Sequence, residues 1–273
     1  MYGSPGWPGG AECEGAVRQM DIRSYIICAT PRSGSTLLCD LLAGSGVAGR
    51  PASFYRRESI GSWAQRLGVP ISEGTDNELF ERRYLEAIRR EGTAGTDLFG
   101  LRLMWPSLAE LNGKLDQLFP GLSDDRARLE AAFGSTLYLH LTRADKVAQA
   151  VSRLRAEQSG LWHLDADGGE RERSGPPAAP AYDAVAIEGF VSEAVDHDAA
   201  WRRWFAAQGI APMPLSYEEL SAAPQTVLAD VLVALGQDRA AASRAKVRSS
   251  RMADAESADW AARYRASGRP SGD

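Results

Sequence analysis

The chain has 273 residues and a formal net charge of −5, with 31 basic residues against 36 acidic ones. Its length allows a large hydrophobic core, in one large domain or two small ones. The mildly acidic balance argues against a nucleic-acid-binding protein, which usually carries a basic face. No apolar run approaches the length of a transmembrane helix, and the N-terminus lacks the pattern of a secretory signal. We therefore expect a cytoplasmic protein, with residues 1–20 as a flexible leader and residues 21–273 as a single domain.

The cysteines and histidines number three each, and they are scattered without the spacing of zinc ligands or of a disulfide framework. We therefore expect no metal site. Three of the basic residues are lysines and the other 28 are arginines. Coding bias explains most of this excess, but a guanidinium group also binds phosphate or sulfate in a bidentate manner. Position along the chain must decide which arginines form an anion site.

Two strand–loop–helix units stand out in chain order. The first is the apolar run 24–30, followed by a helix that starts at Ser35 and carries leucines at helical spacing. The second is the run 135–141, followed by a helix over 146–158 for which Asp145 provides a cap. Further helices are predicted at 77–90, 107–118, 185–208 and 226–235, and further strands at 98–104 and 213–216. This alternation predicts a three-layer α/β fold with a mostly parallel central sheet flanked by helices.

The stretch 160–180 lacks periodicity and is rich in glycine, proline and charged residues. At about 20 residues it exceeds the usual length of a loop inside a compact domain. We therefore expect it to be either functional or disordered.

The segment between the first strand and its helix, TPRSGST at 30–36, has the composition of an anion-binding loop. Amide groups at a helix N-terminus point toward a ligand, and the helix dipole favours negative charge there. Gly34 allows the backbone to approach the ligand, and Arg32 adds a charged fork. The hydroxyl groups of Ser33, Ser35 and Thr36 add further donors. An ordinary strand–helix turn with a hydroxyl cap is the alternative, but the combination favours a phosphate or sulfate site of the P-loop type.

A P-loop kinase is one enzyme class that such a loop allows. That class requires a lysine in the loop and a magnesium-binding aspartate after an apolar strand. The loop has no lysine and is shorter than a Walker A motif, and no such aspartate is evident. The kinase is therefore kept only as an alternative.

The segment YIICATPRSGSTLLCDLLAGSGVAGRP at 25–51 resembles the start of sulfotransferases that use 3′-phosphoadenosine 5′-phosphosulfate (PAPS), most closely the bacterial trehalose 2-sulfotransferase family. Further similar segments follow in order: FGLRLMW at 99–105, LHLTRADKVAQAVSRLRAEQSGLW at 139–162, YEEL at 217–220 and DWAARYRA at 259–266. The resemblance covers most of residues 24–266. It implies a P-loop-like fold, a homodimer, and transfer of a sulfuryl group from PAPS to a hydroxyl group of a carbohydrate or glycolipid.

The resemblance also assigns residues to the donor. It implies that the loop residues Arg32, Ser33, Gly34, Ser35 and Thr36 bind the 5′-phosphosulfate. Three residues would bind the 3′-phosphate: Arg143, Ser152 and, as a further candidate, Arg251. Arg32 and Arg102 would stabilise charge on the transferred group, because such a transfer depends on positioning and electrostatic stabilisation. No lysine falls where this site needs charge, so we expect an arginine-built donor site without a metal.

The acceptor side departs from the family. The trehalose enzymes carry Gly-Glu-Pro-Gln-Glu-Phe-Phe after the first helix, where this chain has GRPASFY at 49–55. Ser53 replaces the glutamate expected to be the general base, and a serine does that task poorly at neutral pH. Glu58 is one candidate base, and His163 and Asp165 on the long loop are two others. If none serves, the acceptor differs or the chain is a catalytically silent nucleotide-binding homologue.

We predict that the acceptor is contacted by residues near this loop and by residues that follow the later motifs. They are Ser53, Phe54, Tyr55, Trp105, Trp162 and His163. Arg50, Arg56 and Arg57 make the loop basic, so an anionic acceptor also fits. The resemblance therefore does not imply that trehalose is the acceptor of this chain.

Overall fold

The computed structural model describes residues 21–70, 77–164, 169–173, 175, 178–246 and 255–272. Its central sheet has four parallel strands in the order β2-β1-β3-β6. Their bounds are β1 Ser24–Ala29, β2 Phe99–Met104, β3 Thr136–Thr142 and β6 Met213–Ser216. The chain passes from β1 to β2 on one side and then to β3 on the other, and such a reversal opens a crevice at the carboxyl ends of the strands. The predicted parallel sheet is confirmed.

Strand β1 is fully buried because helices cover both faces of the sheet. Ile26 and Cys28 pack into one hydrophobic cluster, whereas Tyr25, Ile27 and Ala29 pack into a second cluster on the opposite face. Alternate side chains of a strand point to opposite faces, so a strand between two helical layers is apolar at every position. This explains the unbroken apolar run in the sequence.

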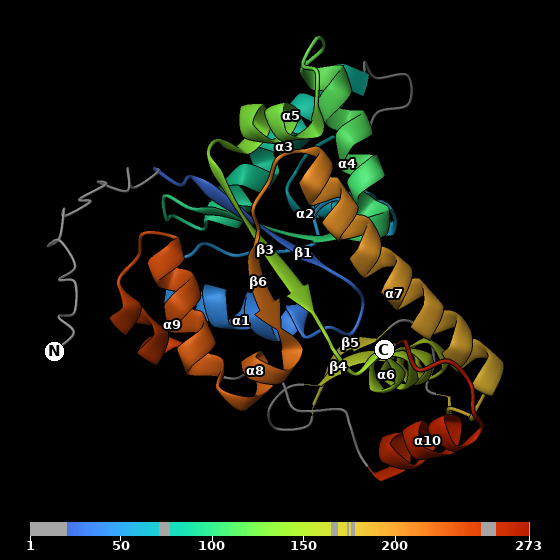
Figure 1. Ribbon diagram of the computed structural model, residues 1–273. Helices are drawn as coiled ribbons and strands as arrows, with labels where there is room; N and C mark the ends of the chain where they lie inside the picture. The colour runs from blue at the N-terminus through green and yellow to red at the C-terminus, as the bar shows by residue number, and fades with distance from the viewer. Residues whose placement is uncertain are drawn as a thin grey trace, which may run out of the picture.

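The two helical layers enclose the sheet (Figure 1). One layer contains α1 Ser35–Ser45, α8 Tyr217–Ala222, α9 Pro224–Ala234 and the 3-10 helix η2 Arg239–Arg244. The other contains α2 Ile60–Arg66, α3 Asn77–Thr93, α4 Trp105–Leu118, α5 Asp125–Phe133 and α7 Ala184–Ala207, with the short η1 Arg57–Ser59 before α2. The predicted three-layer α/β fold is therefore confirmed.

A third cluster lies beyond the sheet, where α6 Lys146–Ser159 packs against the first half of α7 and against α10 Ala255–Ala266. Val151, Val191 and Tyr264 represent the three helices in this cluster. Because α7 is 24 residues long, it reaches from the sheet to this outlying group (Figure 1). Helix α7 therefore packs against both the sheet and the group of α6 and α10.

The aperiodic stretch 160–180, expected to be either functional or disordered, contains a hairpin of β4 Leu161–Leu164 and β5 Glu170–Arg173. The strands pair antiparallel with register irregularities. Helix α6 ends at Gly160, whose positive φ of 69° turns the chain directly into β4. Helices α2, α5, α8 and α10 were likewise not predicted from the sequence. The predicted leader 1–20 and Arg251 lie outside the described residues.

Within those ranges, no helix combines the length and the apolar character needed to cross a membrane.

Candidate functional site

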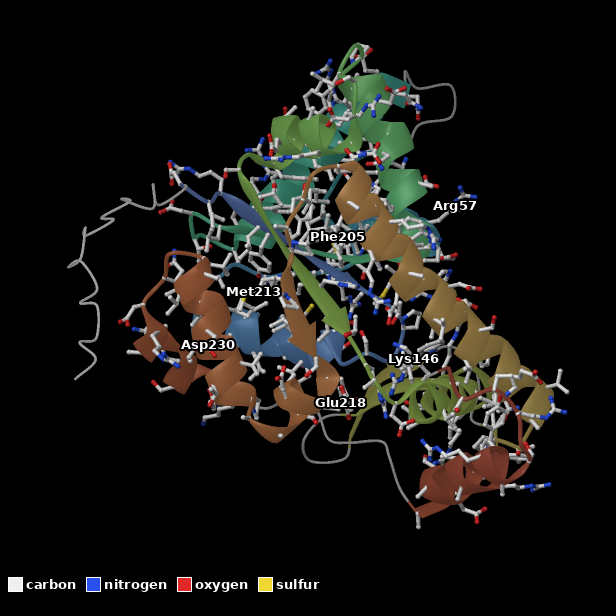
Figure 2. All side chains as sticks on the ribbon, in the orientation of Figure 1. Arg57, Lys146, Phe205, Met213, Glu218 and Asp230 are labelled. Carbon is white, nitrogen blue, oxygen red and sulfur yellow. The ribbon has the colours of Figure 1, made fainter. Side chains whose placement is uncertain are left out.

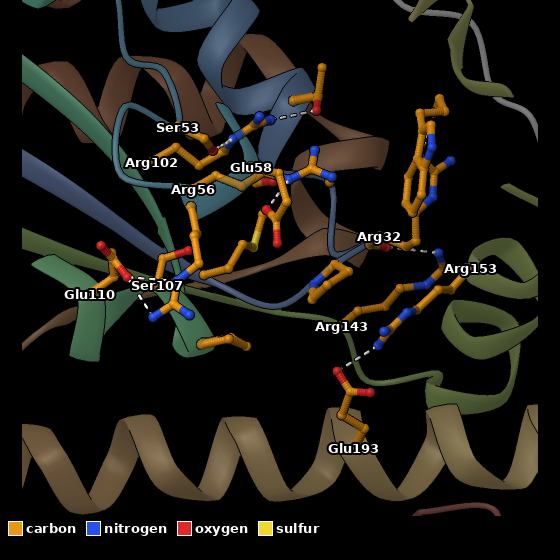
Figure 3. A pocket seen from close by; sticks show the side chains of 18 of the residues that line it. Arg32, Ser53, Arg56, Glu58, Arg102, Ser107, Glu110, Arg143, Arg153 and Glu193 are labelled. Atoms are coloured by element: carbon orange, nitrogen blue, oxygen red, sulfur yellow. Dashed lines mark hydrogen bonds and ion pairs between the residues drawn. The ribbon is translucent and has the colours of Figure 1, made fainter. Parts of the chain in front are cut away.

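A cavity of about 1290 Å³ opens at the carboxyl ends of the central strands. Arg32, Arg102 and Arg143 line it, and they come from the ends of β1, β2 and β3 respectively. Figure 3 shows Arg32 and Arg143 next to each other and Arg102 on another part of the wall. The parallel sheet thus brings together three cations that are at least 40 residues apart in the sequence.

The loop after β1 has a backbone suited to close contact with a ligand. Arg32 and Gly34 both have positive φ angles, 65° and 90°. A Cβ atom at position 34 would lie 2.7 Å from Cδ2 of Tyr217, so only glycine fits there. Gly34 is also the N-cap of α1 and offers no side-chain cap to the amides of the first turn. Such a turn suits an anion that accepts from those amides.

The hydroxyl groups of the loop differ in their surroundings. Ser35 and Thr36 line the cavity. Ser33 is fully buried and absent from the lining, and its Oγ has no hydrogen-bond partner among the residues described. The structure therefore places two of the three predicted hydroxyl donors at the cavity.

Arg32 reaches across the cavity to the second strand–helix unit. Its Nε donates to Ser152 Oγ at 3.0 Å, and its Nη1 donates to the Trp162 carbonyl oxygen at 2.6 Å. Arg143 in turn donates from Nη1 to the Arg32 carbonyl oxygen at 3.3 Å, and its guanidinium carbon lies 4.4 Å from the ring centroid of Tyr217. Residues predicted for the two anionic ends of the donor thus adjoin each other.

Arg102 is a half-buried cation held by neutral groups. Its Nε donates to Ser53 Oγ and its Nη1 donates to Thr36 Oγ1, both at 2.8 Å. Among the described side chains, no carboxylate forms an ion pair with Arg102. Its position is therefore fixed while its charge stays available to an anion. Ser53, which replaces a glutamate in the family motif, serves here as an arginine partner.

Gln149 of α6 forms hydrogen bonds with the start of the loop after β1. Its Nε2 donates to Thr30 Oγ1 at 2.9 Å and to the Pro31 carbonyl oxygen at 2.7 Å. The side chain is almost fully buried, and sequence reasoning gave it no role. Its hydrogen bonds therefore join the first and second strand–helix units.

Four carboxylates line the cavity: Glu58, Glu110, Glu157 and Glu193. Glu157 accepts from Arg153 at 2.8 Å. Glu193 accepts from the same arginine at 2.7 Å (Figure 3). Glu58 and Glu110 lie on the side of the cavity that carries Ser53 and Arg102, so these two are the candidates for a proton acceptor.

Glu58 is exposed and accepts from Arg56 Nε at 3.2 Å. A hydrogen bond from its own backbone amide, followed by the charge of Arg56, lowers the pKa of Glu58. Glu110 is only 20% exposed and accepts from Arg57 Nε at 2.8 Å. Both carboxylates are therefore held by arginines of the loop after α1, and Glu110 is the more enclosed.

The predicted acceptor residues divide into two groups. Ser53 and Trp162 line the cavity. Phe54 and Tyr55 lie in the hydrophobic core instead, and the ring of Trp105 packs edge-on against Trp201 with centroids 5.2 Å apart. These rings fill the layer between the sheet and its helices, where burial of apolar area stabilises the fold.

The remaining predicted residues are only partly described. His163 belongs to β4, but its side chain lies outside the described part of the structure, as do all of Asp165 and Arg251.

Sequence reasoning missed one wall of the cavity. Pro106, Glu110, Lys114 and Gln117 of α4 line it at intervals of three or four residues, as on one helix face. Helix α4 starts directly after β2, so it begins at the carboxyl edge of the sheet. Polar residues at helical spacing after a strand were therefore the signal that could have predicted this wall. The wall also gives Lys114 a place at the cavity, on α4 and paired with Glu81, whereas the sequence prediction concerned lysines at the donor loop.

Where the structure describes the chain, no three His, Cys, Asp or Glu side chains are grouped so as to hold a metal ion.

The family model and the curated relatives that match this chain agree on one family. Residues 24–267 match the Stf0 sulphotransferase family. The chain is 32% identical over 263 residues to trehalose 2-sulfotransferase of Mycobacterium tuberculosis, covering 90% of this chain and 95% of that protein. It is 30% identical to trehalose 2-sulfotransferase of Mycolicibacterium smegmatis, with coverage of 89% and 94%. A solved sulfotransferase domain from the Synechococcus PCC 7002 olefin synthase aligns over 80% of this chain and 74% of that domain, with a TM-score of 0.41 and 18% identity.

Proposed function

The chain belongs to the Stf0 sulphotransferase family of enzymes, and we propose that it transfers a sulfuryl group from PAPS to a hydroxyl group of a carbohydrate or glycolipid. The observation that carries the proposal is the convergence of Arg32, Arg102 and Arg143 on one cavity at the carboxyl edge of the sheet. PAPS has anionic groups at both its 5′ and its 3′ positions, and guanidinium groups bind such oxyanions in a bidentate manner. A cytoplasmic location and a homodimer remain predictions from the sequence.

The two anionic ends of PAPS are assigned to neighbouring parts of the cavity. We assign the 5′-phosphosulfate to the first turn of α1 and to Arg32, because the open turn and the cradle at Gly34 fit an oxyanion. The 3′-phosphate is assigned to Arg143 and Ser152, which adjoin this loop. Arg251 stays a further candidate for the same phosphate.

PAPS would supply a sulfuryl group whose S–O bond to the 5′-phosphate breaks as the acceptor oxygen forms a new S–O bond. Arg102 faces the transferred group in this scheme, because its charge has no carboxylate partner among the described residues. Arg32 stabilises the charge that develops on the leaving phosphate. Both act as preorganised electrostatic partners, which cost little reorganisation during the reaction.

The acceptor proton passes to a carboxylate in this scheme. We assign that role to Glu58, which lines the cavity five residues after Ser53. Its lowered pKa keeps it ionised at neutral pH, as a base must be, although it reduces its affinity for the proton. Glu110 is the alternative carboxylate on the same side of the cavity.

The polar wall around these acids suits a neutral polyol. It includes Ser107, Asn77 and Gln117, whose side chains can bond to hydroxyl groups. The loop arginines Arg56 and Arg57 are each paired with a carboxylate, so they do not form a purely cationic surface. We therefore favour a neutral sugar over the anionic acceptor that the basic loop also allows.

A turnover assay with sulfur-labelled PAPS across a panel of sugars and glycolipids tests the proposal. We expect label on a carbohydrate with the wild-type chain and none with Arg32→Ala. Arg239→Ala is the matched control, because that arginine forms an exposed ion pair with Asp230 and does not line the cavity. Nucleotide binding without transfer to any acceptor would favour a silent homologue, and phosphate transfer from ATP would favour the kinase.

A further inference from the structure

Lys146, the first residue of α6, is a lysine buried next to the donor site. Its Nζ donates to the carbonyl oxygen of Arg143 and to Oδ2 of Asp198 on α7, both at 2.5 Å. The side chains of Lys146 and Asp198 are 9% and 3% exposed. Lysine is almost never buried to this extent without a partner. The ammonium group therefore links the backbone of Arg143 to a different helix.

The turn that carries Arg143 is held from two further directions. Glu218 of α8 accepts hydrogen bonds from two backbone amides of the turn, at 3.1 Å and 3.5 Å. Arg265 of α10 donates to Oδ1 of Asp145 at 2.6 Å. Lys146 and Glu218 both lie near the carboxyl end of β3 (Figure 2). Of these side chains, the one that bonds to the Arg143 backbone is Lys146.

Stability alone does not account for this ion pair. Replacing a buried ion pair by apolar residues of similar volume is often neutral or stabilising for the fold. The pair is also neutral as a unit, so it adds little electrostatic attraction for a nucleotide. Its specific contribution is the bond from the ammonium group to the Arg143 carbonyl oxygen, which fixes the origin of that side chain.

We infer that Lys146 is a positioning residue that sets Arg143 for the 3′-phosphate of the donor. The inference rests on the donor site proposed above. Arg143 is held at its far end by the Arg32 carbonyl oxygen and by the ring of Tyr217. With its backbone held by Lys146 as well, the guanidinium group is preorganised, and preorganisation raises affinity by reducing the ordering that binding requires.

The test uses calorimetric titration with 3′-phosphoadenosine 5′-phosphate. The double variant Lys146→Met/Asp198→Leu removes both charges together, so that neither is left buried alone. We expect it to weaken binding by about tenfold, as for loss of a charge-assisted hydrogen bond. Arg239→Gln/Asp230→Asn is the control, because it removes both charges of an exposed ion pair that does not line the cavity, and its affinity should stay within about threefold of wild type.

A double-mutant cycle separates positioning from a general structural effect. In the Arg143→Ala background, the paired change at 146 and 198 should have no further effect, because the residue it positions is gone. The donor KM should rise while the acceptor KM stays unchanged, and urea denaturation should show that every variant is folded. Equal weakening in both backgrounds, or wild-type affinity of the paired variant, would overturn the inference. Failure of the wild-type chain to bind the nucleotide would overturn the proposed function as well.

Discussion

Replacing Arg102 by methionine removes the cation that faces the proposed transferred group while keeping most of the side-chain stem. The structure gives two hydrogen bonds to lose, one to Ser53 and one to Thr36. Hydrogen bonds from a charged group contribute about 1.5 to 3 kcal/mol each, and partial exposure of Arg102 favours the lower end, so the free energy of unfolding should fall by about 3 kcal/mol. A preorganised donor to charge in a transition state contributes about 3 to 4 kcal/mol, so kcat should fall about 10² to 10³-fold.

The assay is steady-state transfer of label from PAPS at saturating acceptor, with urea denaturation of the same samples. Arg102→Lys is the matched variant, since it keeps the charge but not the fork, and it should retain more activity than Arg102→Met. Binding of 3′-phosphoadenosine 5′-phosphate, which lacks the sulfuryl group, should change less than kcat does. A kcat of Arg102→Met within about threefold of wild type would refute this assignment.

Three further predictions concern the loop, the base and a buried imidazole. Gly34→Ala should weaken nucleotide binding in calorimetry, because the new Cβ would lie 2.7 Å from Cδ2 of Tyr217. Gly95→Ala is the control, because Gly95 has a similar φ of 83° and no atom within 4 Å, and it should leave binding unchanged. Equal effects of the two changes would contradict the loop assignment. Glu58→Gln should lower kcat more than Glu110→Gln with little change in donor binding, and the reverse order would transfer the role of base to Glu110. Burial lowers the pKa of His140, so the unfolded chain binds that proton more readily and the free energy of unfolding should fall as the pH drops from about 7 to about 5. His140→Leu should flatten this dependence in urea denaturation at several pH values, and an unchanged slope would exclude the imidazole as its source.

The parallel sheet and its main helices could be predicted because their apolar patterns are strong. Strand β1 is apolar on both faces, and α1 carries leucines on one face. The missed elements have weaker patterns. Helix α5 is largely charged at its start and begins at a cap on Asp124, whereas β5 reads ERER and has no alternation of apolar and polar residues. Their positions depend on tertiary packing and backbone pairing.

The arginines that line the cavity could be predicted from motifs, but most of the other lining residues could not. Arg32 and Arg143 follow β1 and β3, and Arg102 lies near the carboxyl end of β2, so the topology of one parallel sheet brings them together. Phe54 and Tyr55 follow the family motif in sequence, yet large apolar side chains next to a sheet are stabilised by burial. Sequence reasoning likewise did not predict the buried partners of the donor site, because contacts between distant helices have no local signal.

Calorimetric titration of the wild-type chain with 3′-phosphoadenosine 5′-phosphate, alongside ATP, tests the arginine-built donor site most directly. We predict one binding site for the bisphosphate, with an affinity at least about tenfold higher than for ATP, and loss of that binding in Arg32→Ala. No binding of the bisphosphate, or tighter binding of ATP, would contradict the assignment.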